Sequence, residues 1–565
     1  MSRPFHSVMI APASHAGLEP ARCARKSRAT FLSAVIRGRH AVAIAWLLAL
    51  LSFCGVLRAD LPRRPNIIVI LADDLGYGDV HCYNPERGKI PTPNLDRLAQ
   101  EGMRFLDAHC SSGVCSPSRY TLLTGRYHWR TRLQRGIVGY LEGPLIAEDR
   151  LTIAGMAKQV GYHTACIGKW HLGWDWPIPK GERKWFAPKR GTFPQATAKH
   201  REMWARVYSQ PIADGPTTRG FDEYFGTDVP NWPPYCFIQN DRTVGIPSVF
   251  LPKELFRNHL ASLPGPALPD WDLAAVLPTL AERACDYVRR RAATGRPFLL
   301  YLPLTSPHTP VAVARRWRGK SGLGVPVADF IMQTDAVVGR LLDAVRDSGI
   351  EDNTLIIFTS DNGFAPYVDV NKLLERGHDP SGPLRGYKGD GWEGGHRIPF
   401  LVRWPGVVPE GSVCRQLVHH ADVMATLAEI LDFELPYSAG EDSYSFLPLL
   451  KGSREPIRTH AISQSAQGML TLREGSWKLL MGRGGGGPWS RFSADPKSNE
   501  PAQLYDLSVD LSEQHNLYAK HPDRVERMVA ALRELVERGR STPGPSLKND
   551  VPVNWKKFYK HSSQP

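Results

Sequence analysis

The sequence lacks C-x-x-C pairs, although it contains nine cysteines. This absence leaves a zinc ribbon or a thioredoxin-like redox site unsupported, because both depend on closely spaced cysteine pairs. Cys23 and Cys54 belong to an N-terminal leader, and Cys115 belongs to a motif treated below. For the remaining six cysteines, two interpretations stay open: disulfide bonds, if the protein is exported, or buried free thiols. These cysteines are Cys82, Cys110, Cys166, Cys236, Cys285 and Cys414.

Runs of lysine and arginine are also missing, in spite of a formal net charge of +14. Residues 1–64 hold ten Lys or Arg residues against Glu19 and Asp60, a net charge of +8, so 14 minus 8 leaves only +6 for the rest of the chain. With no recognisable nucleic-acid-binding module, this weak balance predicts no nucleic-acid partner. A hydrophobic content of 42% and a charged content of 22% are near ordinary globular values, so nothing in the composition indicates a disordered, collagenous or multi-span membrane protein.

The hydrophobic run Ala41–Leu57 follows Arg37 and Arg39 and precedes Arg58 and Ala59. This layout is typical of a secretory signal peptide that is cut after Ala59. A short membrane anchor is the alternative, because the run is at the lower length limit for a spanning helix. We therefore expect a periplasmic or secreted protein, with a membrane contact only if the leader is retained.

A chain of 565 residues is long enough for a large α/β domain and a smaller second domain. The pattern predicts a leader over residues 1–59, a catalytic domain over 65–415, a small α+β domain over 416–545 and a tail over 546–565. The small domain is indicated by a helix at 421–431, a strand at 476–481 and an amphipathic helix at 522–538.

Apolar, β-branched runs alternate with helical patterns in the larger part, which favours an α/β fold with a buried parallel sheet. Residues 185–269 are rich in Trp, Pro and Gly and are predicted to form long surface loops. The predicted strands are 66–71, 164–167, 297–304 and 354–359, and the predicted helices are 93–102, 151–161 and 329–349.

Acidic residues follow two of these strands directly. Asp73 and Asp74 come after the first strand, and Asp361 and Asn362 come after the last. Ligands of open parallel sheets gather beyond the carboxyl ends of the strands, so these four side chains are candidates for one site. Oxygen donors with three carboxylates suit Ca²⁺ or Mg²⁺ rather than zinc.

The segment Cys115-Ser116-Pro117-Ser118-Arg119 closely resembles the C-x-P-S-R signature of the type I sulfatase family. In that family, which includes arylsulfatase A and N-acetylgalactosamine-6-sulfatase, the cysteine is oxidised to formylglycine after translation. The resemblance implies an alkaline phosphatase-like fold, in which helices flank a mixed central sheet and a smaller α+β domain follows. It also implies a formylglycine-generating or anaerobic sulfatase-maturating enzyme as a partner.

A formylglycine made from Cys115 is a geminal diol when hydrated. One hydroxyl attacks sulfur to form a covalent sulfoenzyme, and the other then loses its proton and expels inorganic sulfate as the aldehyde forms again. Pro117 is expected to start the following helix, which places residue 115 near the positive end of a helix dipole. The family resemblance also makes Cys115 a metal ligand together with Asp73, Asp74, Asp361 and Asn362, with Ca²⁺ as the expected ion and Mg²⁺ as the alternative.

Two further segments resemble the family and supply candidate catalytic residues. In Gly168–Gly173, with the sequence GKWHLG, Lys169 and His171 are two apart and face one way if the chain is extended. Lys169 is then expected to bind sulfate oxygen, and His171 to hold or deprotonate the formylglycine hydroxyl. In the segment 305–310, His308 is the candidate donor of a proton to the leaving alcohol or phenol.

The loop Pro383–Gly395 resembles a family segment that carries a second sulfate-binding lysine, here Lys388. The resemblance implies that Arg119, Lys169 and Lys388 together neutralise the sulfate anion. The predicted activity is hydrolysis of sulfate esters, with a sulfated small molecule or polysaccharide as substrate. Trp174, Trp176, Trp204 and Trp232 are candidates for stacking on sugar rings, with packing inside loops as the alternative.

Two other functions are consistent with the same residues. A phosphodiesterase or phosphonate monoester hydrolase can use the same nucleophile, although one metal set with paired lysines favours a sulfate monoester. A glycan-binding protein without catalysis is the other alternative, if Cys115 stays unmodified.

Overall fold

The computed structural model of the chain describes residues 64–186, 196–256, 262–493 and 499–559. Contacts divide the chain into the units Met1–Asp60 and Leu61–Pro565, and all of the described residues belong to the second. The predicted leader lies outside the described residues, so its signal or anchor role and the predicted export stay predictions. Within the described ranges, no helix is both long and apolar enough to cross a bilayer.

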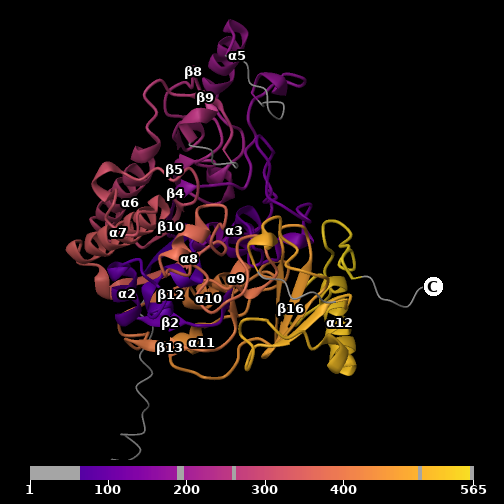
Figure 1. The fold of residues 1–565 in the computed structure, drawn as a ribbon. Coiled ribbons are helices and arrows are strands. Elements are labelled where there is room, and N and C mark those ends of the chain that lie inside the picture. The colour runs from indigo at the N-terminus through magenta and orange to yellow at the C-terminus, as the bar shows by residue number, and fades with distance from the viewer. Residues whose placement is uncertain (1–63, 187–195, 257–261, 494–498, 560–565) are drawn as a thin grey trace, which may run out of the picture. The chain divides into compact units, whose positions relative to one another are not determined.

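A mixed sheet of ten strands lies at the centre of the described residues (Figure 1). Strands β11, β1, β10, β4 and β5 are parallel neighbours, and the antiparallel pairs lie towards the two edges. The predicted mixed central sheet is therefore confirmed. In spatial order the strands are β13 (Ser412–Cys414), β2 (Met103–Phe105), β12 (Phe400–Arg403), β11 (Thr354–Ser360), β1 (Asn66–Asp73), β10 (Phe298–Pro307), β4 (His163–Lys169), β5 (Glu223–Thr227), β6 (Ile238–Gln239) and β7 (Arg242–Thr243).

The central strands are buried along nearly their whole length, which explains their continuous apolar sequences. All four strands predicted for the sheet are present as β1, β4, β10 and β11, and each reaches beyond the predicted carboxyl end. Because these four are mutually parallel, their carboxyl ends meet at one edge of the sheet.

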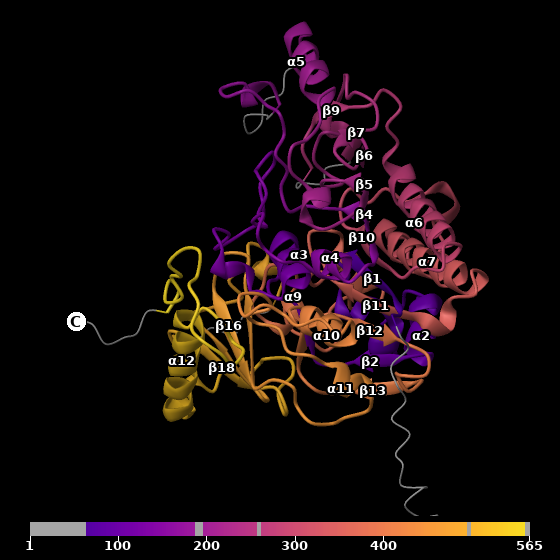
Figure 2. The same cartoon turned by 180° about the vertical axis from the view of Figure 1, so that it is seen from behind.

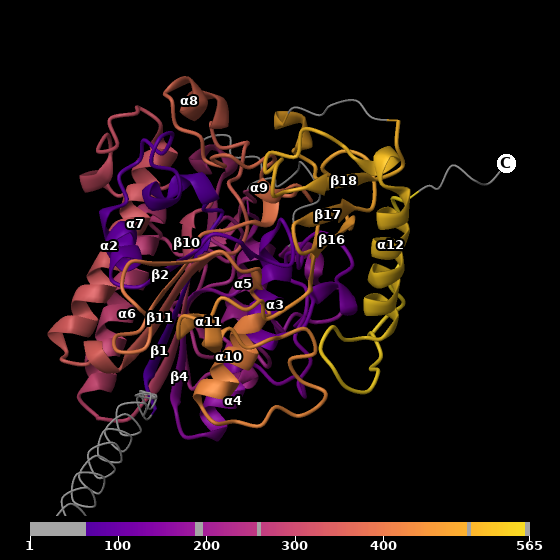
Figure 3. The same cartoon turned by 90° about the horizontal axis from the view of Figure 1, so that it is seen from below.

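Helices cover both faces of this sheet (Figure 3). Alternate residues of β1 point to opposite sides: Ile67 and Val69 pack with helices α3, α4 and α10, whereas Ile68 and Ile70 pack with α2, α6 and α7. The predicted helices at 93–102, 151–161 and 329–349 are confirmed as α2, α4 and α7. The bounds are α2 (Pro93–Gln100), α3 (Cys115–Thr124), α4 (Ile153–Gln159), α6 (Val276–Ala292), α7 (Pro326–Asp347) and α10 (Asp422–Ile430).

The interpretation of residues 185–269 as surface loops is wrong for helix α5 and for the strands β5, β6 and β7 of the central sheet, of which α5 and β5 are the longest. Helix α5 (Ala198–Tyr208) begins after the N-cap Thr197, whose side chain accepts a hydrogen bond from the His200 amide, and it buries one apolar face. Strand β5 joins the central sheet beside β4. Both elements are short, so their weak apolar periodicity was hidden among Trp, Pro and Gly residues.

A separate antiparallel sheet lies near the C-terminus, with helix α12 packed on it (Figure 2). This confirms the predicted small α+β domain, including the strand and the helix expected at 476–481 and 522–538. The exact domain limits stay predictions, and α10 packs with the core of the central sheet. The elements are β15 (His460–Gln464), β16 (Leu470–Glu474), β17 (Trp477–Leu480), β18 (Gln503–Asp506) and α12 (Pro522–Glu537).

Lys478 in β17 joins the small sheet to the rest of the unit through buried ion pairs. Its ammonium lies 3.0 Å from Glu393 and 2.9 Å from Glu513, and all three side chains are fully buried. Glu393, His109 and His396 are close enough to one another to hold a metal ion. However, Lys478, Arg473 and Arg397 already pair with Glu393, so a divalent cation would be repelled there. We interpret this group as an ion-pair network.

Lys478→Met is expected to lower the free energy of unfolding by roughly 3–5 kcal/mol, because it leaves the buried Glu513 without its cation and removes one of the three cations that pair with Glu393. The change is measured as a loss of thermal and urea stability. Lys199→Met is the matched control, because Lys199 pairs with Glu202 on the surface, where such pairs contribute about 0–1 kcal/mol. Equal losses in the two variants would contradict the structural role of Lys478.

Candidate active site

The candidate site lies where the four central strands end. Asp73 is the last residue of β1, Lys169 is the last residue of β4, His308 follows β10, and Asp361 follows β11. Strand β1 is irregular at this point, because its register with β10 shifts between Leu71 and Asp73. Asp74 then adopts a left-handed backbone with a φ of 67°, a conformation that is uncommon for residues with side chains.

Cys115 is placed by the first turn of α3. The helix begins at Cys115 itself and ends at Gly125, which has a φ of 64°. Pro117 therefore lies inside the first turn, and the prediction that it starts the helix is wrong. Residue 115 still lies at the positive end of the helix dipole, as predicted. The serines of the motif hold the backbone: Ser116 accepts a hydrogen bond from the Val138 amide, and Ser118 donates one to the Ser112 carbonyl.

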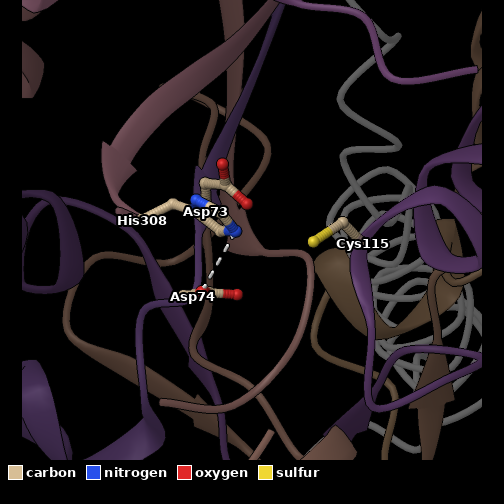
Figure 4. Close-up of side chains that lie close together, drawn as sticks. All are labelled: Asp73, Asp74, Cys115 and His308. Carbon is tan, nitrogen blue, oxygen red and sulfur yellow. Dashed lines mark ion pairs between the residues drawn. The ribbon is translucent and has the colours of Figure 1, made fainter. Parts of the chain in front are cut away.

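Cys115, Asp73, Asp74 and His308 converge on one point. Each of them offers one ligand atom, and these atoms all lie within 4.8 Å of one another. Figure 4 shows the sulfur of Cys115 pointing towards the two carboxylates and the His308 ring. His308 Nε2 lies 3.6 Å from Asp74 Oδ2. All four side chains are buried, with exposed fractions of 6% or less.

Asp361 and Asn362 belong to the same group. The Asp74 amide donates to Asp361 Oδ1 at 3.1 Å, and Asn362 Nδ2 donates to Asp74 Oδ1 at 2.8 Å. Asn362 Oδ1 is buried and has no hydrogen-bond partner among the described residues. A buried carbonyl oxygen without a partner is costly, and the Asn362 side chain that carries it contacts Asp74 in a group of three carboxylates, so the donor set fits an oxygen-preferring divalent cation.

Three cationic side chains, all buried, balance the carboxylates. Lys169 Nζ donates to both oxygens of Asp73 at 2.9 and 2.7 Å, and Lys388 Nζ lies 2.6 Å from Asp74 Oδ1. Arg119 donates through Nη2 to Asp361 at 2.7 Å and through Nη1 to the Lys169 carbonyl at 3.1 Å. Each predicted sulfate-binding cation is therefore also a partner of one predicted metal ligand.

Burial and these pairs shift the pKa values of the site in both directions. Burial and the charge of Asp73 raise the pKa of Asp361 to about 7, against the effect of Arg119. Burial opposes the charge of the Lys388 ammonium, but Asp74, Cys115, Tyr367 and Asp73 together raise the pKa of Lys388 well above its ordinary value. Burial raises the pKa of the Cys115 thiol to about 12, although Lys169 and Lys388 lower it. The unmodified Cys115 is therefore a protonated thiol at neutral pH.

The two histidines present different ring nitrogens. His171 Nε2 lies 3.3 Å from the Val138 carbonyl, and only a protonated nitrogen can donate a hydrogen bond to that carbonyl. In the neutral ring, Nδ1 of His171 is then an acceptor, and this buried atom has no partner among the described residues. His308 Nδ1 lies 2.7 Å from the Thr309 carbonyl, which leaves Nε2 towards Asp74. The extended backbone that we assumed for His171 is wrong, since β4 ends at Lys169 and His171 has a φ of 54°. Burial lowers the pKa of His171 well below its ordinary value, and the charges of Lys169 and Arg119 lower it further, against the effect of Asp73.

The tryptophans proposed as sugar-binding residues are mostly packed inside the protein. Trp174, Trp176 and Trp204 are buried, so stacking on a ligand is excluded for them in this structure. Trp232 is only partly buried, and its ring centroid lies 5.5 Å from that of His171. Sequence reasoning missed Tyr367 and Trp489, whose ring centroids each lie 6.0 Å from Lys388 Nζ.

Comparisons with known proteins agree on one family. A family model described as Sulfatase matches residues 65–433. The chain is 31% identical to N-acetylgalactosamine-6-O-sulfatase of Bacteroides thetaiotaomicron, over 84% of this chain and 93% of that protein. It is 33% identical to human arylsulfatase A, over 84% of this chain and 87% of that protein.

Solved structures show the same fold. A protein from a study of how Bacteroides thetaiotaomicron metabolises multiple glycosaminoglycans has a TM-score of 0.70 and 29% identity, over 84% of this chain and 99% of that one. The phosphonate monoester hydrolase of Agrobacterium radiobacter has a TM-score of 0.51 and 20% identity, over 84% of this chain and 95% of that one. At that identity the second likeness concerns the fold alone.

Proposed function

Because this chain belongs to the sulfatase family and is a sulfuric ester hydrolase, we propose that it acts through a formylglycine made from Cys115. The observation that supports this most is the convergence of Cys115 with Asp73, Asp74 and His308 within 4.8 Å. Two lysines border the same group. A sulfate ester placed there meets a nucleophile position, a metal position and positive charge together.

The state of the Cys115 thiol favours modification over direct attack. With its pKa raised to about 12, the thiol is protonated at neutral pH and is a weak nucleophile. A hydrated formylglycine supplies one hydroxyl that attacks sulfur and a second whose proton loss releases sulfate from the sulfoenzyme. Because Cys115 is only 2% exposed, a formylglycine-generating or anaerobic sulfatase-maturating enzyme would need access before the domain folds.

Asp73, Asp74, Asp361 and Asn362 would hold Ca²⁺, or Mg²⁺ in its place, beside residue 115. When bound, such an ion supplies a Lewis acid that polarises a sulfate oxygen and favours the ionised nucleophile. Arg119 then acts mainly by holding Asp361, since its Nε and its Nη2 both donate to that carboxylate.

Lys169 and Lys388 would bind sulfate oxygens and stabilise the charge that grows on them. The present contacts of Lys169 are compatible with this role, because an ammonium has three donors and Lys169 uses two of them on Asp73. The free Nδ1 of His171 is suited to accept a proton from a hydroxyl at position 115. His308 would serve the leaving-group oxygen through Nε2.

A sulfated glycan or an aryl sulfate is the proposed substrate. The relatives include an N-acetylgalactosamine-6-O-sulfatase and an arylsulfatase, whose names indicate a sulfated sugar and an aryl sulfate as substrates. Parallel assays with 4-nitrophenyl sulfate, N-acetylgalactosamine 6-sulfate and bis(4-nitrophenyl) phosphate test the activity. A strong preference for the phosphate diester would contradict the proposal and favour a phosphodiesterase, and an intact thiol mass for the Cys115 peptide would favour a protein without catalysis.

Removal of divalent ions is expected to lower kcat/KM for sulfate esters by at least about a hundredfold, because a Lewis acid contributes several kcal/mol to the transition state. Added Ca²⁺ should restore activity and raise the melting temperature, since it binds the folded state. In the Asp361→Asn variant, added Ca²⁺ should neither restore activity nor raise the melting temperature. Full activity after exhaustive chelation, with no change in melting temperature on Ca²⁺ addition, would rule out the proposed ion.

A further inference from the structure

Tyr367 and Trp489 form an aromatic pair beside Lys388. Their ring centroids lie 4.8 Å apart with an angle of 44° between the ring planes. Lys388 Nζ lies 6.0 Å from the centroid of each ring, and the same nitrogen lies 2.6 Å from Asp74 Oδ1. The pair therefore borders the charged site directly.

Trp489 comes from the C-terminal part of the chain and is held in place by a glycine segment, residues 484–487. The Gly391 amide donates to the Gly485 carbonyl at 2.7 Å. A Cβ on Gly487 would lie 2.6 Å from the backbone carbonyl of Gly389, so only glycine allows the two chains to approach this closely. The hydroxyl of Ser490, the next residue after Trp489, donates to Asp390. Backbone contacts on both sides thus fix the indole next to Lys388.

Exposure separates this aromatic pair from the catalytic group. Cys115, Lys388 and Asp74 have exposed fractions of 2%, 4% and 2%. Tyr367 and Trp489 are both partly exposed, although each ring centroid lies only 6.0 Å from Lys388 Nζ. Aromatic rings at the border of a buried anion site can contact what is attached to the anion, because that part of a ligand must extend away from the buried charges.

We propose that Tyr367 and Trp489 bind the ring of the leaving group to which the sulfate is attached. The inference rests on the proposed function, since it takes the sulfate position from Lys388 and residue 115. A ring joined to sulfate through one oxygen, or through a CH₂–O group, lies only a few bonds from the sulfur. That reach is comparable with the 6.0 Å between the lysine nitrogen and either aromatic ring. The small C-terminal domain would then select substrates, while the catalytic groups come from the central sheet.

The test measures binding in a Cys115→Ala background, so that neither modification nor turnover affects the result. Calorimetric titrations in Ca²⁺ buffer use three probes: N-acetylgalactosamine 6-sulfate, 4-nitrophenyl sulfate and inorganic sulfate. Adding Trp489→Ala is expected to weaken the binding of at least one ring-bearing probe by about tenfold, the scale of one aromatic contact, and to leave inorganic sulfate within about twofold. The probe that loses more identifies whether a sugar ring or an aryl ring is the better fit.

Trp477→Ala is the matched control, because Trp477 is also a partly buried tryptophan of the small domain but packs against Arg524 and His521. It should leave the binding of all three probes unchanged, and Trp489→Phe should recover most of the ring affinity. Equal weakening of inorganic sulfate by Trp489→Ala would overturn the inference, because it would mean that the indole only supports Lys388. Unchanged binding of both ring-bearing probes would overturn it as well. If the parent with intact Trp489 binds no sulfated probe, the proposed function fails together with the inference.

Discussion

Cys115→Ala is expected to abolish sulfate-ester hydrolysis while the protein still folds. Alanine removes the only side chain at the centre of the Asp73, Asp74 and His308 group that can become a nucleophile. It is also the best helix former, and residue 115 is the first residue of α3, so the helix should persist. The expected loss exceeds about a thousandfold in kcat, as is typical when a covalent nucleophile is removed. The loss of kcat is measured from the release of 4-nitrophenol from 4-nitrophenyl sulfate. Circular dichroism checks that the variant still folds.

Cys115→Ser should also fail, for a different reason. Serine offers one hydroxyl, so sulfate transferred to it cannot leave by aldehyde formation, and a stable sulfated serine is the expected mass-spectrometric product. Cys285→Ala is the control: this buried cysteine lies in α6, on the other face of the sheet, and its loss should leave kcat unchanged. Turnover that persists in Cys115→Ala would remove residue 115 from the mechanism.

The acidic half of the site could be predicted because strand order in a parallel sheet has a simple consequence. Asp73 and Asp361 each end an apolar run, and neighbouring parallel strands bring such ends to one edge. The sequence pattern therefore predicted their proximity across nearly three hundred residues. The Cys115 motif was recognisable for another reason: it is contiguous, and its local structure is one helix turn.

The remaining features depend on tertiary contacts that no local pattern records. Lys169 reaches Asp73 from the end of strand β4, and Arg119 reaches Asp361 from helix α3. Trp489 lies about a hundred residues beyond Lys388 and meets it only because the small domain docks through its glycine segment. The left-handed backbone at His171 likewise depends on its surroundings, since an isolated histidine prefers other conformations.

Lys388→Ala is expected to lower kcat/KM for sulfate esters by about a hundredfold to a thousandfold, the usual effect of losing one group that stabilises oxyanion charge. Two effects add here. The sulfate loses a cation, and Asp74 loses the ammonium that lies 2.6 Å away. Inorganic sulfate should inhibit the variant more weakly for the same reason, so its inhibition constant separates loss of anion binding from a general loss of activity.

Lys372→Ala is the matched control for that prediction, because Lys372 pairs with Asp369 on the exposed helix α8 (Val370–Glu375) and lies on the surface. It should leave kcat/KM and sulfate inhibition unchanged. Lys388→Arg keeps the charge but replaces a compact ammonium by a planar fork, so we expect only partial recovery. Recovery by arginine with a normal inhibition constant would support charge as the main role. An alanine variant that keeps normal sulfate inhibition would instead mean that Lys388 serves Asp74 and the metal position, and that sulfate is held by Lys169 without it.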